Sequence, residues 1–197
     1  MKKVILLLIL FGVPIWVQAQ VVATINDKSI SSKEFLWVYK KNNLGKNQPS
    51  YEELSKYLDL YLNFKLKVLD AKNLGLDKDP SYQAEIEGYE KALKAQKKSA
   101  PRNSEFDFIM NEYREGVLMF NISEQKVWNK ATEDEEALKV IYESRQKTEY
   151  LEKSFEEVRG EISMIYQSQL ENAWLTHLKN KYTIKINESE LRKLAKL

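Results

Sequence analysis

The chain has 197 residues, of which 31 are basic and 29 acidic, with no cysteine and a single histidine. The absence of cysteine excludes a disulfide framework, a thiol nucleophile and a cysteine-based zinc site. Charges of both signs are mixed along the chain, so it lacks the concentrated basic face that nucleic-acid binding requires, and we expect no nucleic-acid partner.

The first nineteen residues have the pattern of a secretory signal peptide. Lys2 and Lys3 precede an apolar run, Val4–Val17, and Val17-Gln18-Ala19 fits a cleavage site before Gln20. A membrane anchor is the alternative, but a spanning helix needs about 20 apolar residues, more than this run contains. We therefore expect residues 1–19 to be a cleaved signal peptide and the rest, 20–197, to be a periplasmic protein without an integral membrane anchor. The expected product carries no net charge, because both lysines of the signal are removed.

Two short β-prone runs flank the predicted helices. The first, Val21–Ile25, is followed by the turn signal Asn26-Asp27-Lys28, and the second is Tyr182–Ile186. Strands this short are not stable alone in water, so we expect the two runs to pair with each other. Such pairing would join the two ends of 20–197 and close one domain around the helices.

Helix-start residues recur along the chain. A Ser or Thr followed three residues later by an acidic residue satisfies free backbone amides at the start of a helix. This pattern occurs at Ser31, Ser50, Ser104, Thr132 and Ser154. Ser123 and Asn187 are further start signals. The pair Asp79-Pro80 is expected to begin a helix, and Gly75 to end one. The predicted fold is therefore mainly α, with helices over about 31–41, 50–74, 80–98, 104–120, two between 123 and 147, 154–180 and a short one after 187. Residues 42–49 and 100–103 are the predicted loop and linker.

Four stretches carry family-level patterns: VVATINDKSISSKEF, YLDLYLNFKLKVLDAKNLGLDKDPSYQAEIEGYEKAL, FIMNEYREGVLMFNISEQKVWNKATEDEEALKVIYESRQ and SFEEVRGEISMIYQSQLENAWLTHLKNKYTIKIN. Together they resemble the N-terminal module and the C-terminal helix and strand of the SurA-like family, periplasmic chaperones related to parvulin-type peptidylprolyl isomerases. The similar parts cover residues 21–94, 106–150 and 154–187. The resemblance implies a SurA-like chaperone module of several helices with a short two-stranded pairing of its N- and C-terminal strands.

The isomerase domains of larger relatives have no counterpart in this chain. They would be inserted near residues 96–104 and 150–154, where only a few residues connect the flanking segments. Parvulin domains use Gly-rich turns and paired histidines around the proline site, whereas this chain has His177 alone. The resemblance therefore implies a reduced form without isomerase activity.

Few residues invite a catalytic or metal-binding interpretation. His177 has no second histidine beside it, and we interpret it as a partly exposed helix residue. The acidic pairs Glu52-Glu53, Glu135-Glu136 and Glu156-Glu157 could serve a two-carboxylate mechanism. Each pair, however, lies in the first turn of a predicted helix, where carboxylates stabilise the helix dipole. With no phosphate-binding loop either, we expect no catalytic residues, no metal and no cofactor.

Two apolar segments are candidates for binding other polypeptides. The helix 50–74 has an apolar arc wider than a surface helix needs, and residues 113–128 form an aromatic and methionine cluster. Such side chains suit both ordinary cores and adaptable binding surfaces, and the sequence leaves both interpretations open. The candidate client-binding residues are Tyr57, Tyr61, Phe64, Met119, Phe120 and Trp128.

The leading functional hypothesis is an ATP-independent chaperone, or holdase, that binds unfolded or partly folded exported proteins. The resemblance further implies clients of the outer-membrane type. The alternative is a structural or adaptor subunit that uses the same surfaces to hold one fixed protein partner or a second copy of itself. An active prolyl isomerase would require a site unlike that of parvulins.

Overall fold

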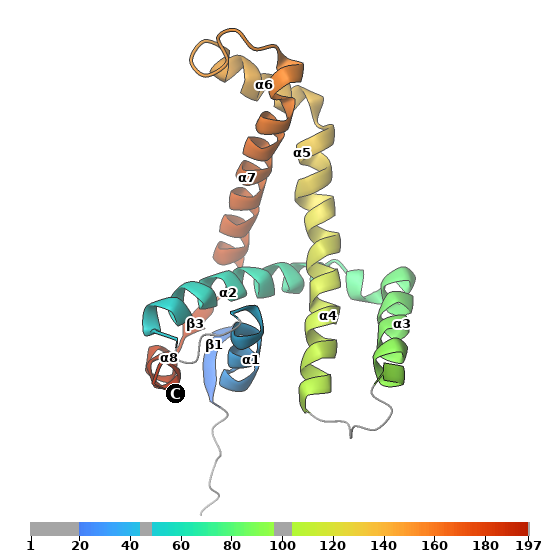
Figure 1. Ribbon diagram of the computed structural model, residues 1–197, viewed down its shortest axis with the longest axis vertical. Coiled ribbons are helices and arrows are strands. Elements are labelled where there is room, and N and C mark those ends of the chain that lie inside the picture. Colours follow the sequence, from blue (N-terminus) through green and yellow to red (C-terminus); the bar gives the residue numbers. More distant parts are fainter. Residues whose placement is uncertain (1–19, 44–48, 97–103, 197) are drawn as a thin grey trace, which may run out of the picture.

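The computed structural model describes residues 20–43, 49–96 and 104–196. Within these ranges the protein is mainly helical, with one small antiparallel sheet whose strand order is β2-β1-β3, as Figure 1 shows. The predicted fold class, mainly α with a short strand pairing, is therefore confirmed. The expected signal peptide, the linker 100–103 and most of the loop after residue 43 lie outside the described residues.

The sheet joins the two ends of the described chain. β1 (Val21–Ile25) pairs antiparallel with β3 (Ile184–Ile186), which confirms the predicted pairing. The structure adds β2 (Lys28–Ser31), which forms a hairpin with β1 through the turn Asn26-Asp27. The sequence does not predict this strand, because it is short and mostly polar. Asn26 has a φ of 50°, a left-handed conformation that asparagine tolerates better than most residues.

The predicted caps position the first three helices. α1 (Ser32–Asn42) begins after Ser31, whose hydroxyl accepts a hydrogen bond from the Glu34 amide at 3.1 Å. α2 (Tyr51–Asn73) starts with the predicted capping box of Ser50 and Glu53. The chain then turns at Gly75, which has a φ of 77°, and passes through the short helix η1 (Leu76–Lys78). α3 (Pro80–Gln96) starts at the predicted Asp79-Pro80 pair.

A long helical column follows α3. It consists of α4 (Ser104–Ser123), a π-helical segment η2 (Glu124–Trp128) and α5 (Asn129–Glu133). The prediction that Ser123 starts a new helix is wrong, because Ser123 is buried and has helical backbone angles in the middle of this column. Its burial among apolar neighbours keeps the helix running through a residue that otherwise favours a start.

The last three helices each begin after a capping residue, and two of these caps are the predicted ones. α6 (Glu135–Gln146) is capped by Asp134, whose carboxylate accepts from the Ala137 amide at 3.1 Å, and not by Thr132 as predicted. The Thr132 hydroxyl instead donates to the carbonyl of Trp128 at 3.1 Å. α7 (Phe155–Lys181) has the predicted capping box at Ser154, and Asn187 caps α8 (Glu188–Leu194).

The elements form a base and an arm, which Figure 1 shows from the side. In the base, α1 and α8 pack with α2 and with the sheet, and α2 also crosses α4. In the arm, η2 and α5 lie beside α7, and α6 packs on α7 at the far end. The main apolar core fills the base and the start of the arm, while a second cluster around Leu138, Tyr150 and Ile162 fills the tip. Within the described ranges, no helix is both long and apolar enough to cross a membrane.

Candidate functional site

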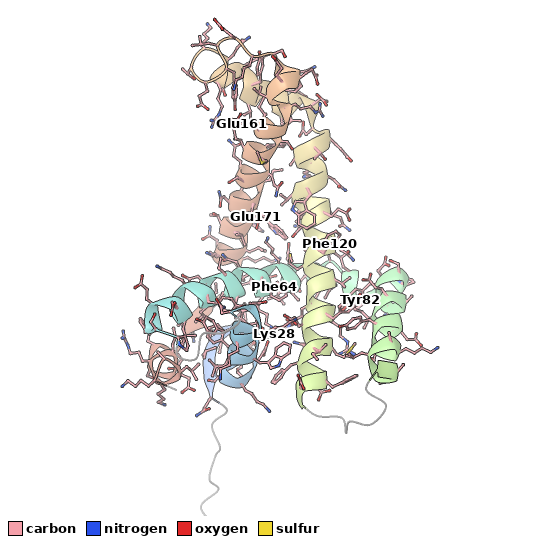
Figure 2. All side chains as sticks on the ribbon, viewed as in Figure 1. Lys28, Phe64, Tyr82, Phe120, Glu161 and Glu171 are labelled. Atoms are coloured by element: carbon pink, nitrogen blue, oxygen red, sulfur yellow. The ribbon has the colours of Figure 1, made fainter. Side chains whose placement is uncertain are left out.

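The structure separates the six candidate client-binding residues by exposure. Only Phe120 is largely exposed, at 51%. Tyr61 belongs to the buried core, and the remaining four are partly buried side chains packed against that core: Tyr57, Phe64, Met119 and Trp128. Phe120 lies on α4 where the column enters the arm, as Figure 2 shows.

The candidates on α2 hold α1 and α2 together. The Tyr61 hydroxyl donates to Glu34 Oε1 at 2.6 Å, and the Phe64 ring stacks on the Tyr61 ring. Burial, together with the neighbouring carboxylate of Glu34, raises the pKa of Tyr61. Tyr57 meets Tyr39 edge to face and accepts a hydrogen bond from Asn42 at 2.7 Å. These three side chains therefore have clear packing roles.

The candidates on the helical column have different surroundings: two form an aromatic pair, and one packs against the main core. Phe120 and Trp128 form an edge-to-face pair with ring centroids 5.0 Å apart. Trp128 belongs to the π-helical segment, and segments of this kind are frequent at functional sites. Met119 packs against the main core, with its sulfur 3.5 Å from the Ser123 hydroxyl. The exposed aromatic surface on the column is thus centred on Phe120.

Phe120 lines an open groove of about 550 Å³ on one face of α4. Ile109, Tyr113, Val117 and Phe120 follow one another at spacings of three or four residues, which places them on the same side of the helix. We call this surface the α4 groove. Gly116 also lines it, and a Cβ atom added there would meet nothing within 4 Å, so the groove is open at this point.

α3 and α1 supply the rims of the α4 groove. On the α3 side, Tyr89 stacks on Tyr113 with centroids 3.7 Å apart, and the Tyr113 hydroxyl donates to Glu85 at 3.0 Å. Partial burial and this carboxylate raise the pKa of Tyr113. On the α1 side, Lys41 forms an ion pair with Glu112 of α4. An apolar floor is therefore bordered by charged groups of both signs.

Only part of this groove is predicted from the sequence. Tyr113, Val117 and Phe120 belong to the predicted apolar and aromatic cluster in 113–128, whereas Ile109 and Tyr89 lie outside it. The spacing of apolar residues on α4 is a usable signal for Ile109. Tyr89 could not be found this way, because its contribution depends on the packing of α3 against α4.

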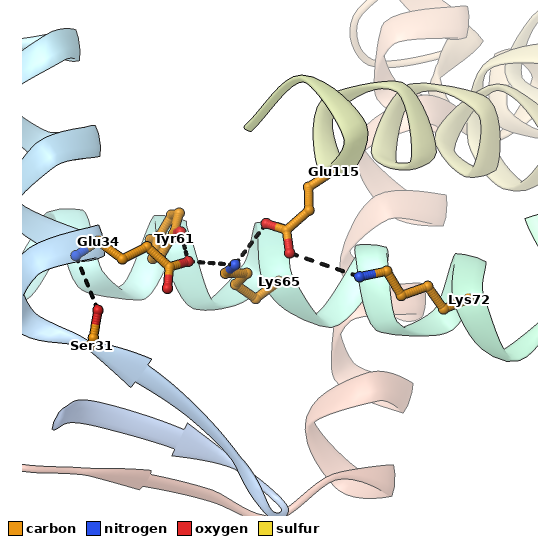
Figure 3. A network of polar contacts seen from close by, with 6 residues as sticks. All are labelled: Ser31, Glu34, Tyr61, Lys65, Lys72 and Glu115. Carbon is orange, nitrogen blue, oxygen red and sulfur yellow. Dashed lines mark hydrogen bonds and ion pairs between the residues drawn. The ribbon is translucent and has the colours of Figure 1, made fainter. Parts of the chain in front are cut away.

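A second cavity, of about 230 Å³, lies between β2, α2 and α4 beside a polar network. Figure 3 shows Lys65 of α2 at its centre, with its Nζ 2.6 Å from both Glu34 of α1 and Glu115 of α4. Burial opposes the charge on Lys65, but the two carboxylates outweigh it and raise the pKa of Lys65. Lys72 lies 3.9 Å from Glu115 at the edge of the network. This arrangement connects three helices through charges.

The residues considered for catalysis do not assemble into a site. His177 is exposed on α7, and the described part of the chain holds no group of three or more potential metal ligands. The three acidic pairs lie in the first turns of α2, α6 and α7. Glu53 and Glu157 accept hydrogen bonds from the backbone amides of Ser50 and Ser154, respectively, which is a structural role.

No protein-family model, curated protein or solved structure matches the chain. The resemblance to the SurA-like family therefore stays a prediction from the sequence motifs.

Proposed function

We propose that the protein is an ATP-independent chaperone that holds unfolded exported polypeptides and has no prolyl isomerase activity. The observation that carries the proposal is the α4 groove, an open apolar floor with charged rims and an aromatic ring, Phe120, exposed at one end. Its volume lies within the range of about 300–1,000 Å³ that is typical of ligand sites. The groove is large enough for a few side chains and too small for a folded domain.

The composition of the groove suits varied sequences. Aromatic and aliphatic side chains on its floor gain from burying any apolar residue, since the hydrophobic effect has no direction. The charged residues that border the floor, Lys41, Glu85 and Glu112, already bind partners within the chain, so little in the groove selects one sequence over another. A segment held there is kept from pairing with other exposed strands, which is the step that leads to aggregation. The sequence resemblance and residues 1–19 support exported, outer-membrane-type clients and a periplasmic location.

Gly116 provides the sharpest test of this proposal. Gly116→Trp adds a large side chain where the groove is open, without a backbone clash, because no atom lies within 4 Å of the added Cβ. Aggregation of an outer-membrane β-barrel protein and of two unrelated soluble proteins, each diluted from urea, would be followed by light scattering. We expect Gly116→Trp to lose most of the protection and Gly116→Ala to retain it.

Gly160→Trp on α7 is the matched control, since Gly160 is also helical with open space around its added Cβ. It should protect all three proteins as the unmodified chain does. Neither tryptophan variant should unfold the protein, because glycine within a helix is itself unfavourable by about 0.5–1 kcal/mol relative to alanine. Full protection by a folded Gly116→Trp variant would contradict the proposal.

A structural or adaptor subunit is the second candidate function. The observation in its favour is a group of exposed apolar side chains on the far part of the arm: Val140, Leu151 and Met164. A fixed partner or a second copy would bury them in one stoichiometric interface. Sedimentation at increasing protein concentration tests self-association, and triple replacement of these residues by Ser should then abolish it while leaving client protection intact.

A further inference from the structure

β2 lies at an edge of the sheet. The strand order is β2-β1-β3, so β1 is paired on both sides while the outer side of β2 has no strand partner among residues 20–43, 49–96 and 104–196. An open edge presents unpaired backbone donors and acceptors to any further strand. The second cavity runs beside this edge and is lined by residues of β2 itself.

The hydrogen bonds of β1 to the C-terminal strand establish its backbone orientation. The Asn26 amide donates to the carbonyl of Thr183 at 2.7 Å, and the Asn187 amide donates to the carbonyl of Val22 at 2.8 Å. Backbone groups of successive residues point to opposite sides of an antiparallel strand. The even-numbered residues at this end of the sheet therefore face β3, and the odd-numbered residues of β1 face β2.

The pairing register of β1 and β2 shows which backbone groups of β2 point to the open edge. Ala23 lies opposite Ile30, and Ile25 lies opposite Lys28. These two pairs exchange the backbone hydrogen bonds between β1 and β2. Ser29 lies between them, so its N–H and C=O point away from β1, toward the open edge.

The second cavity has room for side chains of an added strand. Ser29 and Ile30 of β2, Val68 and Leu69 of α2, and Asn111 of α4 are among its lining residues. A residue paired with Ser29 would share the solvent face of the sheet with it, because paired residues lie on the same face. The residues on either side of that partner would point to the face of Ile30, where the cavity has its apolar floor.

The rim of the cavity carries unbalanced positive charge. Lys28, at the end of β2, makes no ion pair within the described part of the chain. Lys72 lies 3.9 Å from Glu115, a carboxylate that Lys65 already binds at 2.6 Å. Figure 3 shows Lys72 already paired with Glu115, so Lys28 is the lysine that remains available for an acidic group on an incoming segment.

We infer that the open edge of β2 binds an extended segment of an unfolded polypeptide as a fourth strand. On the face that enters the second cavity, the segment carries an apolar residue beside Ile30 and an acidic residue beside Lys28. This inference rests on the proposed function and names the kind of segment that the chaperone takes. It also assigns the binding of extended strands to a surface separate from the α4 groove.

The test measures the exchange of the Ser29 amide hydrogen by NMR. The probe is a short blocked peptide in which Thr alternates with Val and Glu, so that Val and Glu share the face that enters the cavity, and the control probe is the same peptide with N-methyl groups on alternate amides. We expect saturating peptide to slow exchange at Ser29 by roughly tenfold or more, while Ile30, already paired with β1, changes little. The N-methylated peptide should bind far more weakly, because it cannot complete the strand pairing.

Two variants test the same edge. Ser29→Pro removes the outward N–H without removing a β1–β2 hydrogen bond, and proline is tolerated at such edge positions. It should weaken peptide binding strongly, whereas Ser29→Ala should bind as the unmodified chain does. Unchanged Ser29 exchange in the presence of bound peptide, or equal binding of both peptides, would overturn the inference.

The outcomes for this edge and for the α4 groove are distinguishable. If clients are protected from aggregation but the Ser29 amide never responds, the inference fails and the proposed function stands. If the peptide protects Ser29 but no client is protected, the proposed function fails and the edge site remains. A third outcome is protection of the Ser29 amide that rises with protein concentration in the absence of peptide, while sedimentation shows a doubled mass. That result would show that a second copy occupies the edge, and it would overturn the inference.

Discussion

The indole Nε1 of Trp174 donates a hydrogen bond to Oδ2 of Asp70 at 3.0 Å, in the buried contact between α7 and α2. The same carboxylate lies 3.0 Å from Nζ of Lys126 in the π-helical segment and 3.5 Å from Nζ of Lys181. One buried carboxylate therefore joins the base to both sides of the arm.

Asp70→Asn should destabilise the protein by about 1.5–3 kcal/mol, the usual contribution of hydrogen bonds to a charged group. The amide keeps a hydrogen-bond acceptor for Trp174 but removes the charge that attracts Lys126 and Lys181. Chemical denaturation at neutral pH measures the loss. Asp59→Asn, an exposed change on the same helix, is the control and should have almost no effect.

The stability contributed by Asp70 should also depend on pH. Burial opposes ionisation of this carboxyl, but its bonds to Lys126 and Trp174 and the nearby lysine charges outweigh burial, so the pKa of Asp70 is lowered. A group with a lowered folded-state pKa stabilises the fold above its unfolded pKa of about 3.9 and loses that effect as pH falls through the lower value. The difference in stability between the unmodified chain and Asp70→Asn should therefore shrink below about pH 4. A constant difference down to acid pH would contradict this account.

Lys65→Met should cost about 3–5 kcal/mol, because it leaves two poorly solvated carboxylates without their shared partner. The Lys65 and Glu115 side chains are only 13% and 10% exposed. Thermal melting, with Lys56→Met as the control, measures the effect. Lys56 makes an ion pair with Glu52 on the exposed face of the same helix, and its replacement should leave the melting temperature nearly unchanged. Equal effects of both substitutions would show that the Lys65 network adds no stability.

Much of the fold could be predicted because its signals are local. The capping boxes at Ser50 and Ser154, the stop at Gly75 and the start at Pro80 each need only a few neighbouring residues, and the structure confirms them. Ser123 was misassigned because its local preference for a helix start is overridden by burial within a continuous column. β2 was missed because its pairing with β1 depends on the turn at Asn26 rather than on an apolar pattern of its own.

The candidate site was less predictable, because exposure depends on tertiary packing. Tyr61 and Phe120 are both aromatic residues on long amphipathic helices, and no local pattern distinguishes them. α1 and its carboxylate Glu34 bury Tyr61, whereas Phe120 lies beyond the helices that cover the base. The α4 groove itself exists only because α3 packs beside α4 without covering its full face.

Deletion of α8, or truncation of its buried side chain Leu191, should destabilise the base. Leu191 is fully buried, and on the same helix Glu190 accepts a buried hydrogen bond from the Ser32 hydroxyl of α1 at 2.7 Å. Leu191→Ala should cost about 2–5 kcal/mol, as is usual for a core leucine. Leu60→Ala, at a position 66% exposed on α2, is the control and should stay within about 0.5 kcal/mol of the unmodified chain. Denaturation by urea measures both, and deletion of 182–197 should unfold the base rather than fray one end.

The tip of the arm should open independently of the base. Its buried cluster of Leu138, Tyr150, Val158 and Ile162 is separate from the main core, so few apolar contacts connect α6 to α2. Segments with small separate cores open with lower free energies than the global transition. Hydrogen exchange should therefore be faster in 135–150 than in 54–71, and Leu138→Ala should accelerate it in the tip alone. Leu151→Ala, an exposed change in the same region, should leave exchange unaltered. If Leu138→Ala accelerates exchange equally in α2, the tip and the base unfold as one cooperative unit, and the arm cannot move on its own when a client binds.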